Sequence, residues 1–306
     1  MLLAGIMSVG LFAGCSSDSG DNSSDNTDSG GTKDSIVIAT SGETPSLSPT
    51  EHNAVAGSYM NILTYNTLFS SDMDMQPQPD LAESYENVDE STWHFKIKEG
   101  VKFHNGETMT ADDVVASIQW AQGFAEVNLY NSDIVSITKV DDLTVEIKTD
   151  GPDAMLLSNL CHHGNAIVPK SLIDSGHDFN TDPVGTGPYK LVEWKRGDSL
   201  TFEVFEDYFK GPAKIKNMTW KIIPEGSSRT IALEAGKVDF ILEVESMDAD
   251  RLKENSDITV LQYNDTSHNW LMLNNEAPLR AYDSGLQGVE VSDSGILYFE
   301  DVYWEE

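Results

Sequence analysis

The chain has 306 residues, of which 39% are hydrophobic and 9% aromatic, so it can bury a core and has room for about two domains. Its 51 acidic residues outnumber 19 basic ones, and the resulting net charge of −32 argues against a nucleic-acid partner, because phosphate binding requires a basic surface. Two cysteines exclude a disulfide framework.

The first 15 residues are typical of a leader. Residues 1–13 are apolar or small, form a run too short to span a bilayer, and lead into Gly14-Cys15. This ending resembles the lipobox of bacterial lipoproteins, although Phe12 stands where the box prefers leucine and no basic residue precedes the run. We predict a signal peptide over 1–15 and a lipid on the Cys15 thiol. An ordinary signal peptide or a buried helix remains the alternative.

Residues 16–34 are predicted to be a flexible linker. They consist mainly of Ser, Asp, Gly, Asn and Thr, a composition that cannot pack. The aspartates do not form an EF-hand loop, because the twelfth position counted from Asp18 is Ser29 and not glutamate.

The folded part begins at a continuous apolar run, residues 36–39, which predicts a strand buried on both faces. A loop with one glycine and two prolines follows over 41–49, and loops at the ends of buried strands often carry ligand contacts. Residues 55–69 have apolar side chains at helical spacing and predict a core-facing helix.

A small α+β unit is predicted over residues 71–182. Apolar and polar residues alternate over 93–97 and 143–147, which indicates two amphipathic strands. Between them, Asn105-Gly106 is a strong turn signal. Thr110 with Asp113 is a variant of the capping box and predicts the start of a helix.

A hairpin with a glycine-rich entry follows at residues 183–209. Strands are predicted over 189–194 and 199–204, with a turn at 195–198. The next elements are a strand over 218–224, a helix over 229–235, and a strand over 238–242, which together form a βαβ-like run. Ser227 is the expected N-cap and Gly236 the expected C′ residue of that helix. One more strand is expected within 260–275.

Two ordered sets of residues resemble a known family. The first set runs from Leu81-Ala82-Glu83-Ser84 through 98–107 to 110–114, and the second runs from 183–189 through 207–209 and 223–224 to 233–239. Both are similar to the extracytoplasmic solute-binding proteins of ABC importers, specifically the peptide- and nickel-binding group called family 5. The resemblance extends over residues 35–278.

The resemblance implies an α/β fold of the periplasmic-binding-protein-like type II, cluster C-like. Its first lobe is expected from 35–70 with 183–278 and 285–306, and its inserted α+β subdomain from 71–182. In the family, the segment similar to 271–278 leads into a second lobe, whereas here residues 282–306 look like the family's C-terminus. The second lobe is therefore expected to be largely absent, and residues 289–304 are expected to dock on the first lobe.

The function implied by the resemblance is the substrate-binding component of an ABC importer. Such a protein captures short peptides or a related small solute and delivers it to permease subunits. We expect a monomer that lies outside the cytoplasmic membrane, touches the membrane through its lipid anchor only, and has no cofactor or catalytic residue. We expect loss of the distal lobe to impair binding.

Other functions are weighed against this one. An inactive remnant or a surface interaction module remains open, with a carboxylate-based hydrolase less favoured. The sequence contains no G-x-S-x-G, Walker, Rossmann or H-E-x-x-H motif.

Candidate cleft residues come from three segments, each of which is alternatively a plain turn or strand end. They are Glu43, Ser46, Leu47 and Ser48; Gly185, Thr186 and Gly187; and His268, Asn269 and Trp270. Cys161-His162-His163 is not assigned to a metal, because adjacent residues of a strand point to opposite faces and no second ligand cluster appears.

Overall fold

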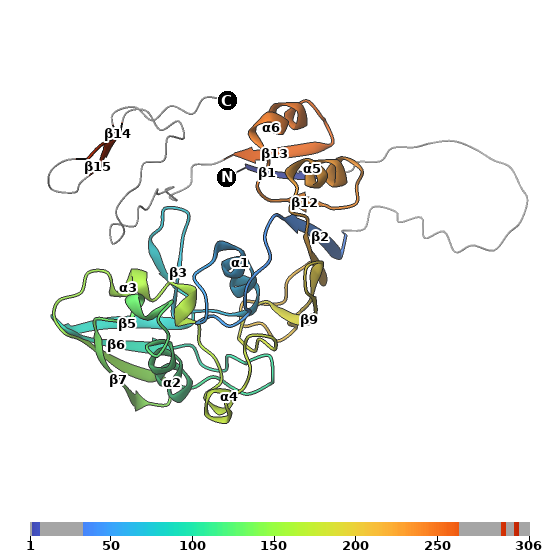
Figure 1. The fold of residues 1–306 in the computed structure, drawn as a ribbon. Coiled ribbons are helices and arrows are strands. Elements are labelled where there is room, and N and C mark those ends of the chain that lie inside the picture. The colour runs from blue at the N-terminus through green and yellow to red at the C-terminus, as the bar shows by residue number, and fades with distance from the viewer. Residues whose placement is uncertain (1, 7–32, 263–288, 292–296, 300–306) are drawn as a thin grey trace, which may run out of the picture. The chain divides into compact units, whose positions relative to one another are not determined.

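The computed structural model describes residues 2–6, 33–262, 289–291 and 297–299 (Figure 1). Residues 1–263 form one compact unit, and residues 264–306 form a second. In the second unit, β14 (Val289–Val291) pairs antiparallel with β15 (Leu297–Phe299). The expected docking of residues 289–304 on the first lobe stays a prediction.

A seven-stranded sheet organises the part of the chain that we call the lobe, residues 33–70 and 183–262 (Figure 1). Strand β2 is parallel to both of its neighbours, β11 and β12. The chain passes from β11 to β12 through α5 (Gly226–Glu234). The strand order is β13 (Ile258–Gln262), β1 (Leu2–Ile6), β12 (Phe240–Ile241), β2 (Ser35–Thr40), β11 (Asn217–Ile222), β10 (Ser199–Val204) and β9 (Tyr189–Lys195).

Both faces of this sheet carry helices. Ile38 of β2 packs in a cluster with Met60 of α1 (Val55–Thr64) on one face. On the other face, Ala39 packs with Leu233 of α5 and Leu252 of α6 (Ser246–Lys253). Burial from both sides is therefore confirmed for Ile38 and Ala39, whereas Ile36 and Val37 are only partly buried.

A four-stranded antiparallel sheet organises residues 71–182, which we call the inserted subdomain. Its strands in order are β5 (Ala82–Asp89), β6 (Thr92–Ile97), β8 (Thr144–Thr149) and β7 (Ile134–Asp141). The apolar face of α2 (Ala111–Ala121) packs on this sheet and forms a separate core. Shorter elements of this region are β3 (Phe69–Ser71), β4 (Pro77–Pro79), η1 (Asn128–Tyr130), α3 (Leu156–Asn159), η2 (His163–Asn165) and α4 (Lys170–Ser175).

The predicted capping box at the start of α2 is confirmed. The Asp113 carboxylate accepts the backbone N–H of Thr110 at 2.8 Å, and the reciprocal side-chain contact of the box is present. The other carboxylate oxygen of Asp113 accepts the N–H of Lys170 at 2.8 Å. Asp113 thus also joins α2 to α4.

Several predicted boundaries differ from the observed ones. The helix predicted over 55–69 ends at Thr64, because the chain is extended at Tyr65 and Phe69 begins β3. The N-cap of α5 is Glu225, two residues before the predicted one, since the N–H of Arg229 already bonds to the Glu225 carbonyl; the Ser227 prediction is wrong. The prediction of Gly236 as C′ residue is confirmed by its φ of +64°. Of the last predicted strand, the described part is β13.

Leu2–Ile6 pairs antiparallel with both β12 and β13. These residues belong to the predicted leader, whose removal stays a prediction. Cys15 lies outside the described residues, so its lipidation and the signal peptide stay predictions. Among the described helices, none has both the length and the apolar character needed to cross a membrane.

Candidate functional site

Glu43 fastens the loop that leaves the carboxyl end of β2. Its Oε1 accepts the indole N–H of Trp194 and the backbone N–H of Gly197, both at 2.9 Å. The Arg196 guanidinium stacks over the Trp194 ring at 3.3 Å and also bonds to the Pro45 carbonyl. Glu43 therefore positions this loop against the turn between β9 and β10.

The other three predicted residues of this loop are buried. Leu47 is 1% exposed in the core beneath α1, and its N–H donates to the Asn180 carbonyl at 3.1 Å. The Ser46 hydroxyl bonds to the Asn180 side chain and accepts the N–H of Ser48 at 2.9 Å. These contacts hold the loop to the inserted subdomain, and a direct role in solute binding stays a prediction.

The predicted turn at Gly185–Gly187 packs tightly against the end of α1. A Cβ on Gly185 would lie 2.3 Å from the Thr64 carbonyl oxygen, and one on Gly187 would lie 2.4 Å from the Thr64 carbonyl carbon. The N–H of Gly187 donates to that same carbonyl oxygen at 2.9 Å. Thr186 is fully buried, with its hydroxyl 3.1 Å from Asn66 Oδ1. The glycines thus serve close backbone packing, whereas their role towards a solute is untested.

Tyr65 connects the two predicted segments. Its ring lies against Gly185, and its hydroxyl donates to the Leu47 carbonyl at 3.1 Å. Burial is the main cause that raises the pKa of Tyr65, so its hydroxyl stays protonated at neutral pH. The third predicted segment, residues 268–270, lies outside the described residues.

A cavity of about 370 Å³ adjoins the loop that leads into α1. Its volume is near the lower end for ligand pockets. The residues that line it are Pro45, Glu51, His52, Asn53 and Ala54 of the lobe, with Glu126 of the inserted subdomain. The sequence reasoning missed this site, because Glu126 is far from the loop in the chain and shares no local pattern with it. We take this cavity and the loop beside it as the candidate site.

Three histidine rings gather beside this cavity. The centroids of His52 and His163 are 5.2 Å apart, and those of His162 and His163 are 4.1 Å apart. Burial, followed by repulsion from His163, lowers the pKa of His52 to about 4, so its imidazole is neutral at pH 7. The ring packing corrects one expectation: His162 and His163 lie at the start of η2 and not in a strand, and their rings are neighbours. In residues 33–262, no group of three potential metal ligands converges.

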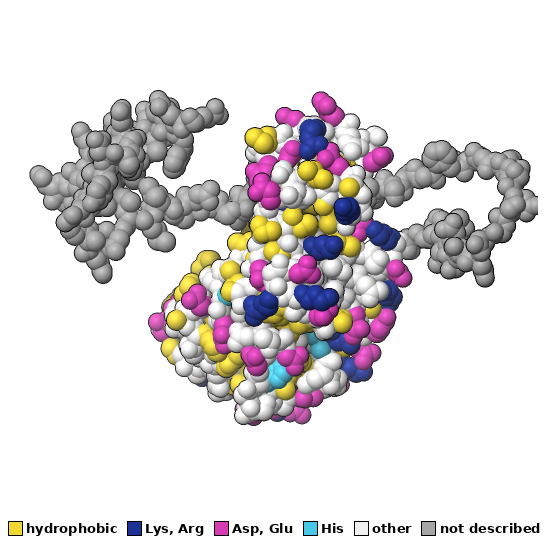
Figure 2. Space-filling model, turned by 45° about the vertical axis from the view of Figure 1, so that its right-hand side comes forward, with side chains coloured by type: hydrophobic (Ala, Val, Ile, Leu, Met, Phe, Trp, Pro, Cys, Tyr) yellow, Lys and Arg dark blue, Asp and Glu magenta, His cyan; other side chains and the backbone are white. Residues whose placement is uncertain are grey.

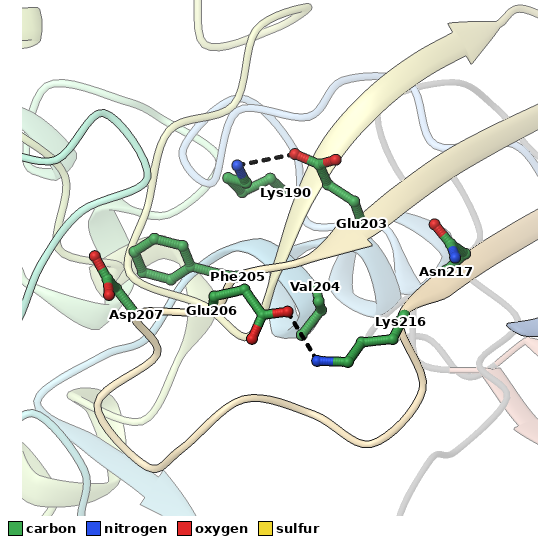
Figure 3. Close-up of a pocket in the computed structure, with 8 residues that line it drawn as sticks. All are labelled: Lys190, Glu203, Val204, Phe205, Glu206, Asp207, Lys216 and Asn217. Atoms are coloured by element: carbon green, nitrogen blue, oxygen red, sulfur yellow. Dashed lines mark hydrogen bonds and ion pairs between the residues drawn. The ribbon is translucent and has the colours of Figure 1, made fainter. Parts of the chain in front are cut away.

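A larger cavity, of about 640 Å³, is lined by residues of β9, β10 and β11 and of the segment that follows β10 (Figure 3). Its lining includes Asn217, the first residue of β11, whereas ligands of open α/β sheets bind at the carboxyl ends of the strands. Two ion pairs already neutralise charges in its wall, Lys190–Glu203 and Lys216–Glu206, each at 2.8 Å. We therefore do not assign this cavity to a solute.

The excess of acidic residues does not form one acidic site on the visible face of the molecule. Figure 2 shows Asp and Glu side chains spread over that face and interleaved with Lys and Arg. Such a surface favours solubility and makes no continuous patch for a polycation.

Comparison with known proteins gives a consistent result. The model of a family described as bacterial extracellular solute-binding proteins, family 5 Middle, matches residues 76–283. The glutathione-binding protein GsiB of Pectobacterium atrosepticum is 30% identical over 245 residues, which cover 78% of this chain and 48% of that protein.

Two solved structures are similar at 28% identity. AgaA of A. tumefaciens R10, in complex with agropinic acid, has a TM-score of 0.68 and is matched over 72% of this chain and 46% of its own. The oligopeptide-binding protein AppA of Bacillus subtilis, in complex with a nonapeptide, has a TM-score of 0.65 and the same coverage. The chain spans about half the length of the relatives it matches.

Proposed function

Because the chain belongs to family 5 of the bacterial extracellular solute-binding proteins, we propose that it is the substrate-binding component of an ABC importer. The solute we propose is a short peptide or a related small molecule, captured outside the cytoplasmic membrane and delivered to a permease. The observation that carries this proposal is the family match over residues 76–283. The same membership confirms the predicted periplasmic-binding-protein-like fold and the prediction that the chain is not an enzyme.

We propose that solute contacts the cavity beside the loop that Glu43 fastens. The cavity offers the Asn53 amide and a neutral imidazole as polar groups, with Glu51 and Glu126 as carboxylates. Carboxylates attract the ammonium group of a peptide, and an amide can pair with its backbone. The relatives named for glutathione and oligopeptides support peptides as the first class to test.

We propose that binding by this chain is weak. Family members close two lobes around a solute, and pockets normally bury most of a ligand's surface. A chain of about half that length supplies fewer walls. Calorimetry with peptides of three to nine residues is expected to give a Kd weaker than about 1 mM, which corresponds to about −4 kcal/mol. A micromolar Kd would refute the impairment.

Spectroscopy at high peptide concentration tests the site itself. Millimolar peptide is expected to shift the amide resonances of Asn53 and Ala54, while those of β6 stay in place. A Glu126→Gln variant is expected to weaken the shift, and the exposed Glu193→Gln is the control. No shift at tens of millimolar peptide would reject the site and favour the second candidate function.

That second candidate is an inactive remnant or a surface interaction module, and the half-length match favours it. Solute uptake by a strain that relies on this protein distinguishes the two. Restored uptake supports the importer component, whereas absent uptake with normal protein levels supports the remnant.

We also propose that Cys15 carries the lipid anchor and that the protein is a monomer. Fatty-acid labelling is expected to disappear in Cys15→Ser, and labelling that persists would exclude this anchor. Light scattering of the purified protein tests the monomer.

A further inference from the structure

Four of the chain's seven histidines lie where the inserted subdomain contacts the lobe. Each of them contacts a group across the boundary between the subdomain and the lobe, or packs against a histidine that makes such a contact. We call His52, His104, His162 and His163 the joint histidines. His94 and His177 pair instead with carboxylates, Glu146 and Asp182.

His104 of the inserted subdomain binds the turn that begins the lobe's second segment. Its Nε2 lies 2.9 Å from the Gly187 carbonyl, and its Nδ1 accepts the N–H of Gly185 at 3.4 Å. Its backbone N–H also donates to the Gly185 carbonyl at 2.8 Å. These partners require the neutral imidazole with its proton on Nε2.

His162 makes an equivalent contact with the loop before α1. Its Nδ1 accepts the N–H of Gly164 at 3.1 Å, and its Nε2 donates to the Asn53 side-chain oxygen at 3.2 Å. The Tyr130 ring stacks on the imidazole, with centroids 3.6 Å apart. These partners again fix the neutral form with the proton on Nε2.

His163 and His52 complete this side of the contact. The His163 Nε2 donates to the His52 carbonyl at 3.3 Å, and the His52 Nδ1 accepts the N–H of Ala54 at 3.3 Å. The Asn61 amide lies 3.4 Å from the His52 Nε2. If the Asn61 amide is turned so that its oxygen faces the His52 Nε2, this oxygen accepts the Nε2–H. The Asn61 oxygen is otherwise buried without a partner.

A second proton on three of these rings meets no acceptor, whereas the His163 Nδ1 lies 3.3 Å from the Ser58 hydroxyl. In His52, His104 and His162, the Nδ1 that would receive it already faces a backbone N–H. A charge on two adjacent rings would also be repelled across the ring contacts of 4.1 and 5.2 Å. Protonation therefore replaces attraction by repulsion at the contact between subdomain and lobe.

The surroundings of the joint histidines favour the neutral form. Burial is the largest cause that lowers the pKa of all four, to about 4 for His104 and about 3 for His162. The charged or titratable groups nearby are Lys190 near His104, Tyr130 on His162, and Glu51 and Glu126 in the cavity wall beside His52.

We propose that the joint histidines form an acid-sensitive latch: neutral imidazoles hold the inserted subdomain to the lobe, and protonation opens this contact while both sheets stay folded. The latch is independent of the proposed function, because its opening needs no solute. An extracytoplasmic protein would meet acid directly, since its surroundings are not buffered by a cell interior.

Amide hydrogen exchange of the full chain at pH 6.5 and pH 4.5 tests the latch. The reporters are the amides of Ala54 and Gly164 and the backbone amide of His104, which donates to the Gly185 carbonyl across the contact, all corrected for the intrinsic pH dependence of exchange. Each histidine that must be neutral in the closed state and has its ordinary pKa of about 6.5 in the open state can lower protection up to about 50-fold over this range, since protonation is linked to opening. Amides of β6 and β11 report only larger openings, so they are expected to stay better protected than the reporters at both pH values. Equal protection of the reporters at both pH values, or reporters as well protected as the strands at pH 4.5, would overturn the proposal.

Two matched variants test whether the pH dependence of exchange comes from the joint histidines. His104→Gln keeps a donor for the Gly187 carbonyl but cannot take up a proton. It is expected to reduce the pH dependence at the backbone amide of residue 104 by the factor that one histidine contributes, whereas His94→Gln is expected to retain it in full. Retention of the full pH dependence in His104→Gln would contradict the proposal. Should His104→Gln fail to fold, the wild-type exchange series and His163→Gln with Gly164 as reporter still decide.

Discussion

Replacing Gly187 by alanine should destabilise the protein through a clash with backbone that cannot move away. The added Cβ would meet the Thr64 carbonyl carbon at 2.4 Å and the Leu63 and Thr64 carbonyl oxygens at 2.6 Å. Overpacking of this kind costs about 1–3 kcal/mol. Displacement of the turn would also break the bond from the Gly187 N–H to Thr64, worth about 1 kcal/mol. The expected loss is therefore about 2–4 kcal/mol, a large part of a typical domain stability of about 5–15 kcal/mol.

Urea unfolding followed by tryptophan fluorescence measures this loss. With an m value near the upper end of the usual range, the midpoint is expected to fall by roughly 1 M. Gly151→Ala is the matched control, because a Cβ there has nothing within 4 Å. That control is expected to be neutral or slightly stabilising, by about 0.4–1 kcal/mol. A midpoint of Gly187→Ala within about 0.2 M of the wild type would refute the reasoning.

Three further outcomes are expected. Glu43→Ala should lower stability by about 1–3 kcal/mol and shift Trp194 emission to the red, because the Trp194 indole and the Gly197 N–H lose their acceptor. Unchanged emission, or an equal effect of the exposed Glu193→Ala, would contradict this prediction. Asp113→Ala should cost about 1–3 kcal/mol in urea unfolding, because the cap of α2 and the bond to Lys170 are lost, whereas Asp112→Ala at an exposed ion pair should cost less than about 1 kcal/mol. The free energy of unfolding should fall from pH 6.5 towards pH 4, because His104, with a pKa of about 4, stays neutral in the fold while the unfolded chain takes up a proton near pH 6.5. Full protonation of this residue in the unfolded chain costs about 3 kcal/mol of stability. A urea midpoint that stays constant over this pH range would exclude this effect.

Strands with one buried face were predictable from the sequence. In β6, β8 and β10, apolar residues alternate with polar ones, because one side of each strand faces a core. The edge strands β5 and β7 were missed. After Ala82, the residues of β5 are exposed, so its sequence lacks the alternation that marks a half-buried strand.

The candidate site was less predictable than the fold. Glu43 was predicted to line the cleft, which stays a prediction, and its observed partners Trp194 and Gly197 lie far from it in the chain and share no local pattern with it. Ser46 and Ser48 were predicted to line the cleft, whereas their hydroxyls are bonded within the fold. The joint histidines meet only after the subdomain packs on the lobe, and local periodicity carries no information about such a meeting.

The continuous subdomain between the two segments of the lobe has a consequence for how the chain folds. Strands β2 and β11 pair across roughly 180 residues, and closing so long a loop is entropically costly. All pairings of the four-stranded sheet, in contrast, lie within residues 82–149. If this sheet forms first, it shortens the loop that β2 and β11 must close by about a third, which is worth about 0.4 kcal/mol. The inserted subdomain then acts as a spacer that collapses early and delivers the last strands of the lobe to the first.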